Sequence, residues 1–462
     1  MKIIGKCIYL WFVALLFAFE IPVLAEPAIE NQKTLEKLID VLKDKRTLDA
    51  NTYNDLKDAL KLEEKILPLK AAVKDDAKGP KVDTDGKFQI ASEDGNFSFR
   101  VGGRIHLDAT FYDNDDNTNN TDSVDARRAR LEIQGSMYKN WDWKLDYEFA
   151  QTSELKGGFR DAYVKYRFSD TPASLTIGQF KEYFGLESLN SSNDLPFVER
   201  SLTSRTFHDI AEATDGRRLG LGFNTNFLDV ITISVGAFAK NVSGDSSDDA
   251  KDPLSAQTRV TISPFHDDAV ALHAGLSANW IDLNDAARAT LSAKPESKLG
   301  AESLISTGEI TNVETFSRYG AEFGAIKGPF WTQGEFMLGD FSRKTESNVT
   351  FAGWHGDVGY ILTGESRVYD FQKGTISNPE LGGAFGNSGF GAFELAARLS
   401  GLDLSSKDIQ GGRESNFSSG LNWYPNDNFR FMLTWTKVLE VKGGAYDNQE
   451  PSEILLRTQF NF

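Results

Sequence analysis

The chain has 462 residues, of which 50 are basic and 67 acidic, and its formal net charge is −17. Its mean hydropathy of −0.37 excludes a membrane protein built of many apolar helices, because each helical span needs about 20 apolar residues. A single cysteine excludes a disulfide-stapled ectodomain, and the acidic balance argues against nucleic acid as a partner. The 33 phenylalanines and 40 glycines leave β-rich classes, including the outer-membrane barrel.

The first 25 residues have the pattern of a secretory signal peptide. Lys2 and Lys6 form a positive start, residues 8–19 form an uncharged apolar run, and small residues precede a cleavage point after Ala25. The apolar run is too short to span a membrane, so it predicts export and cleavage. We therefore expect residues 1–25 to be removed from the mature protein.

Residues 26–80 have helical periodicity. Leu35, Leu38 and Leu42 recur at a spacing of three to four residues, and charges of both signs alternate around them, as on a solvated helix face. The pattern predicts a helical hairpin running into a coiled-coil-like extension. Trimerisation and envelope tethering are its functional interpretations, and a solvated extension is the alternative. We interpret residues 81–96 as a linker.

From Phe97 onward the apolar period changes to two. Phe97, Phe99 and Val101 alternate with Arg100 and other polar residues, which places apolar and charged side chains on opposite faces of a strand. About sixteen such segments follow, separated alternately by short turns and long polar loops. Residues 97–462 are therefore predicted to form an all-β transmembrane domain, an antiparallel outer-membrane β-barrel of about sixteen strands.

Aromatic residues and the chain end support a barrel that crosses the outer membrane. Aromatics near the strand ends form the interfacial girdle that transmembrane barrels carry; they are Trp141, Trp143, Tyr166, Trp280, Trp423 and Trp435. The chain ends on Phe462 with Phe460 on the same face. This ending predicts recognition of Phe462 by the barrel-assembly machinery and contact of the barrel with outer-membrane lipids.

The inward strand positions are rich in arginine, whose charge is permanent and whose planar donors match phosphate oxygens. These positions are Arg100, Arg104, Arg128, Arg130, Arg167, Arg218, Arg259, Arg318, Arg398 and Arg457. An arginine-lined lumen favours anions. Inward carboxylates such as Glu132 and Glu394 also offer cross-strand partners, so a share of these arginines is expected to be paired.

Residues 182–215 form an unusually long connection, and a loop of this length in a compact domain usually has a function. In a wide barrel we expect it to fold inward and narrow the pore. Cationic residues at its base are predicted to form the constriction; they are Lys181, Arg200, Arg205, Arg217 and Arg218.

Several motifs resemble those of the phosphate-selective porin O/P family, in the same order along residues 97–462. They are the runs 127–135, 177–182, 191–201, 362–367, 394–398 and 420–424. The resemblance implies a trimeric sixteen-stranded channel, constricted by inward-folded connections and lined with arginine and lysine. It also implies lysines in a constricting fifth loop, for which Lys294 and Lys298 are the candidates. Matched to the motifs, the predicted anion contacts are Arg127, Arg128, Lys181, Arg200, Arg217 and Arg218.

No motif predicts a catalytic, cofactor or metal site. The five histidines have no pairwise metal spacing, and Ser204 with His208 lacks an acidic orienting residue. The leading hypothesis is a passive anion-selective porin for phosphate or polyphosphate in the outer membrane of a Gram-negative bacterium, and not an enzyme. The alternatives are a general porin with weak selectivity and a structural or envelope-tethering barrel.

Overall fold

A computed structural model provides the structure, which describes residues 40, 43, 53, 54, 57, 79–83, 88–151, 157–208, 216–240, 253–267, 269–386 and 389–462, without the side chains of residues 284–286. Residues 1–81 and 82–462 form two compact units. The predicted signal peptide, residues 1–25, lies outside the described residues. Within residues 26–80, the five described residues before residue 79 are helical, and the hydroxyl of Tyr53 donates to Asp40 Oδ1 at 2.9 Å. The helical hairpin over the rest of this segment stays a prediction.

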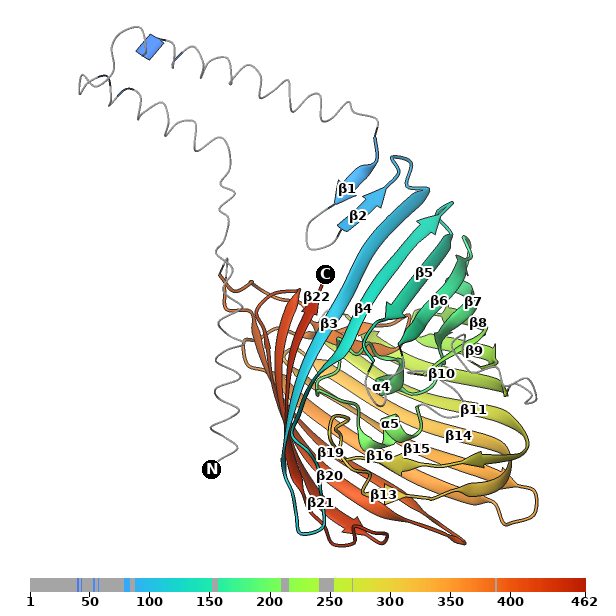
Figure 1. The fold of residues 1–462 in the computed structure, drawn as a ribbon. Coiled ribbons are helices and arrows are strands. Elements are labelled where there is room, and N and C mark those ends of the chain that lie inside the picture. Colours follow the sequence, from blue (N-terminus) through green and yellow to red (C-terminus); the bar gives the residue numbers. More distant parts are fainter. Residues whose placement is uncertain are drawn as a thin grey trace. The chain divides into compact units, whose positions relative to one another are not determined.

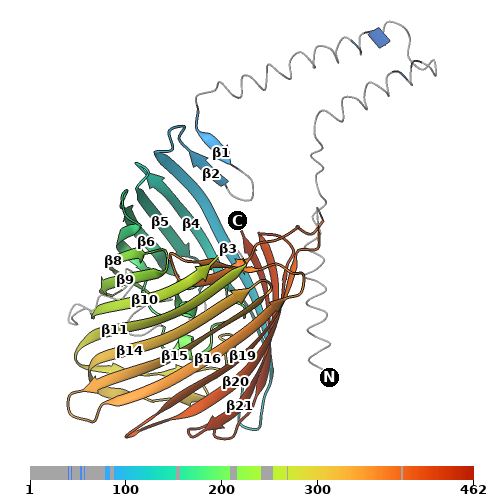
Figure 2. The ribbon, with the colours of Figure 1, turned by 180° about the vertical axis from the view of Figure 1, so that it is seen from behind.

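The second unit is a closed antiparallel barrel of 16 strands, which Figures 1 and 2 show from opposite sides. The barrel strands are β3 (Phe97–Asp113), β4 (Ser123–Met137), β5 (Trp141–Glu148), β6 (Gly158–Arg167), β7 (Ala173–Lys181), β8 (Arg217–Phe227), β9 (Ile231–Phe238), β10 (Leu254–His266), β11 (Val270–Ala289), β14 (Ile310–Lys327), β15 (Phe330–Arg343), β16 (Val349–Ile361), β19 (Ala392–Ser406), β20 (Ile409–Tyr424), β21 (Phe429–Lys442) and β22 (Ser452–Asn461). The predicted antiparallel barrel of about sixteen strands is confirmed, and its first strand begins at Phe97.

Side chains alternate between the lumen and the outer surface along each strand. In β16 every second residue is buried, while Trp354, Val358 and Tyr360 between them are 45%, 47% and 48% exposed. Exposed apolar side chains on the outside of a barrel suit the hydrocarbon of a membrane. Among the helices that the structure describes, none is long and apolar enough to cross a membrane.

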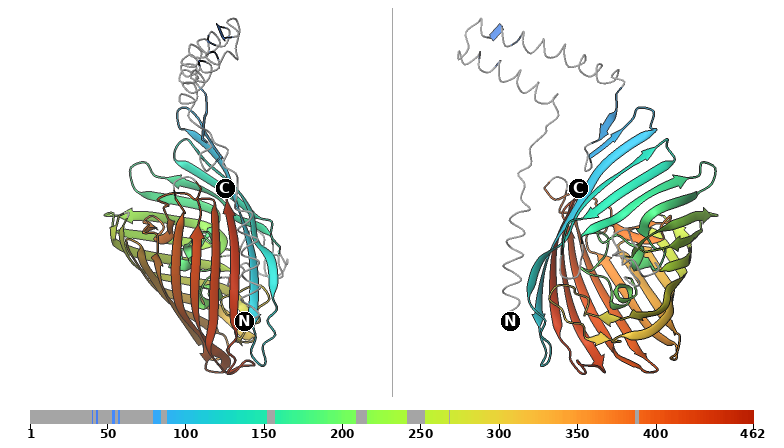
Figure 3. Two further views of the ribbon diagram at one scale, coloured as in Figure 1. Left: turned by 90° about the vertical axis from the view of Figure 1, so that its left-hand side faces the viewer. Right: turned by 45° about the vertical axis from the view of Figure 1, so that its right-hand side comes forward.

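The barrel closes where β22 pairs with β3. The backbones of Phe462 and Gly103 exchange two hydrogen bonds of 3.0 and 3.1 Å. A Cβ on Gly103 would lie 2.5 Å from the ring of Phe462, so a glycine is needed where the last residue packs. Figure 3 shows the C-terminal strand lying against β3.

The segment predicted as a linker, residues 81–96, contains two short strands, β1 (Lys81–Asp83) and β2 (Phe88–Ala91). β2 pairs with residues 98–101 of β3. Because β22 ends opposite Arg104, this part of the β3 edge has no neighbour within the barrel. β2 therefore satisfies backbone groups that the C-terminal strand does not reach.

Connections at one end of the barrel are mostly short, whereas those at the other end are mostly long. The short turns span 138–140, 168–172, 228–230, 328–329 and 425–428, and the longer connections at the other end span 114–122, 149–157, 182–216, 239–253, 290–309 and 443–451. Three connections break the pattern. Residues 362–391 join β16 to β19 at the short-turn end, and the short connections 344–348 and 407–408 lie at the other end. No pattern in the sequence predicted the long connection 362–391.

Two connections enter the lumen from opposite ends. From the long-loop end comes the stretch 182–208, here named the inward loop, which contains α4 (Leu186–Leu189) and α5 (Leu202–Thr206). From the short-turn end comes the inner hairpin, formed by β17 (Arg367–Asp370) and β18 (Thr375–Pro379). A third small hairpin, β12 (Ser292–Ala293) with β13 (Ile305–Ser306), belongs to the long connection between β11 and β14.

The inward loop and the inner hairpin bind each other through backbone carbonyls. Asn190 Nδ2 donates to the carbonyl of Ile376 at 2.6 Å, and Asn378 Nδ2 donates to that of Asn193 at 3.1 Å. Phe197 and Ile376 belong to one buried apolar cluster. Figure 3 shows α4 and α5 within the ring of strands. The predicted inward folding of residues 182–215 is therefore observed for its described part.

Candidate functional site

A β-bulge in β4 turns two consecutive arginines into the lumen. His106 of β3 pairs with Arg128, and the next residue, Leu107, pairs with Ala126, so that Arg127 has no partner in the register. A bulge places two residues of one strand opposite one of its neighbour. Arg127 and Arg128 are accordingly 2% and 1% exposed, although strict alternation would send one of them outward.

Arg127 binds the inward loop instead of facing open space. Its Nε donates to Glu199 Oε1 at 2.7 Å, and Arg457 on β22 contacts the same oxygen at 3.2 Å. Burial raises the pKa of Glu199, but Arg127, Arg457 and Arg128 together hold that pKa well below its usual value. Glu199 is therefore an ionised anchor of the inward loop.

Arg200 and Arg218 also lie in buried polar networks. Arg200 Nε donates to the carbonyl of Glu187 at 3.2 Å, within the inward loop. Arg218 on β8 contacts Glu182 Oε1 at 3.1 Å, and Arg318 on β14 contacts the other oxygen of Glu182. Arg218 and Arg318 thus connect the start of the inward loop to the barrel wall, whereas Arg200 holds two parts of the loop together.

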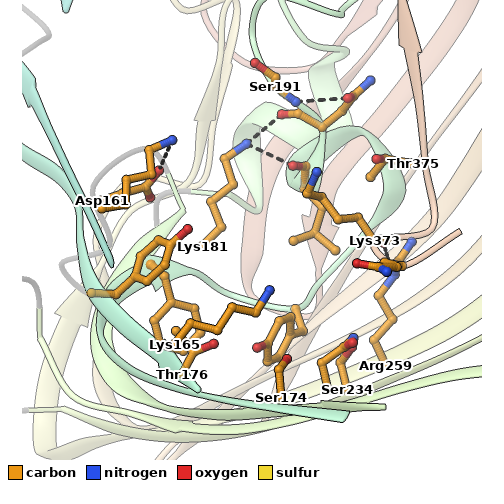
Figure 4. Close-up of a pocket in the computed structure, with 18 of the residues that line it drawn as sticks. Asp161, Lys165, Ser174, Thr176, Lys181, Ser191, Ser234, Arg259, Lys373 and Thr375 are labelled. Carbon is orange, nitrogen blue, oxygen red and sulfur yellow. Dashed lines mark hydrogen bonds and ion pairs between the residues drawn. The ribbon is translucent and has the colours of Figure 1, made fainter. Parts of the chain in front are cut away.

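A cavity of about 500 Å³ lies between β3–β10, the inward loop and the inner hairpin. Its cationic lining residues are Arg104, Arg130, Lys144, Lys165, Arg167, Lys181, Arg217, Arg259 and Lys373, and its acidic ones are Asp161 and Asp194. In Figure 4, Lys165, Lys181 and Lys373 reach this space from three different elements. Seven of these nine cations also pair with carboxylates, most of which lie outside the lining: Arg104 and Lys144 with Glu132, Arg130 with Glu148, Arg167 with Asp142, Arg217 with Asp161, Arg259 with Glu322 and Lys373 with Asp370. The side chains that line the space are therefore mostly cationic, while carboxylates behind them offset much of the charge.

Lys181 stands at the end of β7, where the inward loop begins. Its Nζ donates to the carbonyls of Ser188, Leu189 and Asn190 at 2.9, 3.2 and 2.6 Å. The same side chain lines the cavity. Lys181 thus holds the inward loop in place and contributes to the lining.

Arg217 and Lys144 share one carboxylate. Arg217 Nε lies 2.6 Å from Asp161 Oδ1, and Lys144 Nζ lies 3.2 Å from Asp161 Oδ2. Asp161 therefore offsets part of the positive charge at one wall of the cavity while fixing the directions of both cations.

Of the six predicted anion contacts, the structure brings Lys181 and Arg217 together in the cavity. It places Arg200 in a buried position within the inward loop and Arg127, Arg128 and Arg218 in buried positions on the barrel wall, so the contact of these four with an anion stays a prediction.

The sequence analysis did not single out Lys144, Lys165 and Lys373. Lys144 and Lys165 follow the strand alternation and were identifiable by it. Lys373 lies in the turn between β17 and β18, where no strand alternation exists to predict the direction of its side chain.

The sequence profile of the family described as phosphate-selective porin O and P matches residues 99–462. The chain belongs to this family. Porin O of Pseudomonas aeruginosa is 26% identical over 393 residues, which cover 77% of this chain and 86% of that protein. An uncharacterized protein of Caulobacter vibrioides is 25% identical over 366 residues, covering 76% of this chain and 70% of that protein.

Among solved structures, the outer-membrane protein OmpT of Vibrio cholerae resembles this porin with a TM-score of 0.50 at 9% identity, covering 79% of this chain and 98% of OmpT. At that identity the likeness shows the fold. Family and fold together make the chain a passive channel in the outer membrane of a Gram-negative bacterium, and not an enzyme.

Proposed function

We propose that this porin conducts phosphate and other small anions through the cationic cavity. The observation that carries the proposal is a lining in which nine cationic side chains and two carboxylates face a space of about 500 Å³. Fixed rings of arginine and lysine favour anions in a pore, provided that binding is weak enough to release the ion. Membership of the family described as phosphate-selective porin O and P agrees with a phosphate-class substrate.

The mixture of side chains suits passage better than tight retention. Arginine forks pair with phosphate in a bidentate manner, whereas Lys165 and Lys373 act as flexible point charges. Asp161 lies among the lining residues and repels an anion that comes close to Arg217. We propose that this carboxylate weakens binding enough for the anion to move on.

Among the predicted contacts, we assign direct contact with the anion to Lys181 and Arg217. Arg127, Arg128, Arg200 and Arg218 are proposed to act through their charge and by holding the inward loop that narrows the pore. The constriction by arginines is part of the same proposal.

Planar-bilayer recordings test the proposal with Lys165→Glu in the cavity and Lys442→Glu as a matched control. Lys442 is 52% exposed and contacts Glu440 on the outer surface. Lys165→Glu is expected to shift the reversal potential in a salt gradient toward cations and to weaken the block of chloride current by phosphate. Lys442→Glu is expected to change neither. Equal behaviour of both variants would favour a general porin with weak selectivity.

The resemblance also implies a homotrimer, which we propose together with a role for residues 26–80 in its assembly. Cross-linking of the full mature protein and of a form lacking residues 26–80, both in detergent, tests this. Trimers of the full protein that are lost on truncation support both ideas. Trimers that persist after truncation would contradict a role of residues 26–80 in assembly and would favour envelope tethering as their function.

A further inference from the structure

A buried cluster joins the inward loop to the barrel wall away from the cationic cavity. It consists of Glu187 on α4, Glu335 on β15 and His355 on β16, which are at most 5% exposed. Among the described residues, these three form the group whose potential ligand atoms all lie within 4.8 Å of one another. None of them lines the cavity of about 500 Å³.

The spacing of the three ligand atoms matches a tetrahedral metal centre. His355 Nε2 lies 3.1 Å from Glu335 Oε2 and 3.8 Å from Glu187 Oε2. Ligands at about 2.0–2.1 Å from a tetrahedral zinc ion lie about 3.3 Å apart. The observed separations lie on both sides of that value, so small side-chain shifts would bring all three atoms to bonding distance.

Hydrogen bonds from neighbouring side chains orient the three residues of the cluster, as they orient metal ligands in other proteins. His355 Nδ1 pairs with Asp357 Oδ1 at 3.1 Å, which directs Nε2 toward the two glutamates. A metal-bound histidine commonly donates its other nitrogen to a carboxylate. The hydroxyl of Ser204 donates to Glu335 Oε2 at 3.1 Å, and that of Ser201 donates to Glu187 Oε2 at 2.9 Å.

The charge of the cluster calls for a cation. Glu187, Glu296, Glu335 and Asp357 carry four negative charges, and Arg398 supplies one positive charge at 2.5 Å from Glu187, 2.8 Å from Asp357 and 3.5 Å from Glu296. With a neutral imidazole, which is the form that ligates a metal, the balance is −3. A divalent ion reduces it to −1.

We propose that Glu187, Glu335 and His355 bind a divalent transition-metal ion, with zinc as the probe, and that the ion fastens the inward loop to the wall. One nitrogen and two carboxylate oxygens are a donor set that zinc accepts, and three protein ligands leave a fourth position for water. The site is structural and is independent of which solute the channel conducts.

The test uses untagged, full-length mature protein, folded in detergent with zinc and then passed through gel filtration to remove unbound metal. Mass spectrometry of the metal content is expected to give one zinc per chain for the wild type. His355→Gln is expected to retain less than a tenth of that. The matched control is His273→Gln, because His273 is equally buried but contacts a single carboxylate, Glu322, at 3.0 Å.

Cobalt gives a measurement that needs no variant. Wild-type protein loaded with Co²⁺ is expected to show the intense visible absorption of a tetrahedral or five-coordinate site, and excess zinc is expected to remove it. A wild type that retains no zinc and shows no such absorption overturns the proposal, leaving His355 as the centre of a hydrogen-bonded ion cluster. Equal zinc retention by both histidine variants would also overturn it, because the metal would then bind elsewhere.

Discussion

Both sides of the lumen carry inward arginines, but the two sides use them for different purposes. On the side of β3–β10, arginines paired with carboxylates, such as Arg130 with Glu148 and Arg217 with Asp161, border an open cavity. On the side of β16–β22, each buried arginine faces a carboxylate, as in Arg398 with Asp357 and Arg457 with Asp108 at 2.8 and 2.6 Å. The count of inward arginines therefore does not distinguish the two sides. What distinguishes them is the open space that the paired arginines of β3–β10 border.

The free energy of unfolding should be more sensitive to mutation on the side of β16–β22, where arginine–carboxylate pairs hold the inward loop to the wall. Arg398→Ala removes contacts with Asp357 and Glu187 and the packing of the guanidinium 4.2 Å from the centre of the Phe197 ring. Leaving two buried carboxylates without their partner is expected to cost about 3–5 kcal/mol in the free energy of unfolding. Urea unfolding in lipid vesicles measures this, and a loss below about 1 kcal/mol would contradict the anchoring role.

A smaller, pH-dependent loss is expected for Glu199→Gln. The pKa of Glu199 in the folded protein lies well below its usual value of 4.5, so its ionised form stabilises the fold above that pH. The variant is expected to lose about 1.5–3 kcal/mol at pH 7, the range for hydrogen bonds to charged groups. The difference from wild type should shrink as the pH falls below about 4.5 toward the lowered pKa. A difference that stays constant from pH 7 to pH 3 would contradict this assignment.

On the cavity side, Lys165→Gln should separate stability from selectivity. Lys165 lines the cavity, and its removal is expected to change the free energy of unfolding by no more than about 0.5 kcal/mol. The anion preference in a salt gradient should nevertheless fall. Paired unfolding and reversal-potential measurements check both. A large loss of stability without a change in selectivity would show that Lys165 stabilises the fold and does not select anions.

The smallest effect is expected outside the lumen. Arg413 on β20 is 49% exposed and contacts Glu440 at 3.3 Å, where water screens the interaction. Arg413→Gln is expected to leave unfolding, conductance and selectivity unchanged within error. A clear change in selectivity would show that charge at the outer rim steers ions, and the contrast between the two sides of the lumen would then be incomplete.

Much of the fold was predictable because strand periodicity is local. Alternation identified the barrel from Phe97 and the inward positions of Arg398 and Arg457, and the length of residues 182–215 indicated a loop that folds inside. The bulge at Arg127 was not predictable, because a change of register depends on the neighbouring strand. The inner hairpin was missed as well, since residues 362–391 carry no periodic pattern.

What the sequence determined by itself is the class of protein: alternation, loop asymmetry and family motifs specify a porin of the outer membrane. Which arginines stay available to an anion was decided only by the tertiary structure. Glu187, Glu335 and His355 are separated by up to 168 positions in the numbering, from 187 to 355, and meet because the inward loop crosses the lumen. Charge pairing depends on separations of a few ångströms in space, and these separations cannot be derived from the positions of residues along the chain.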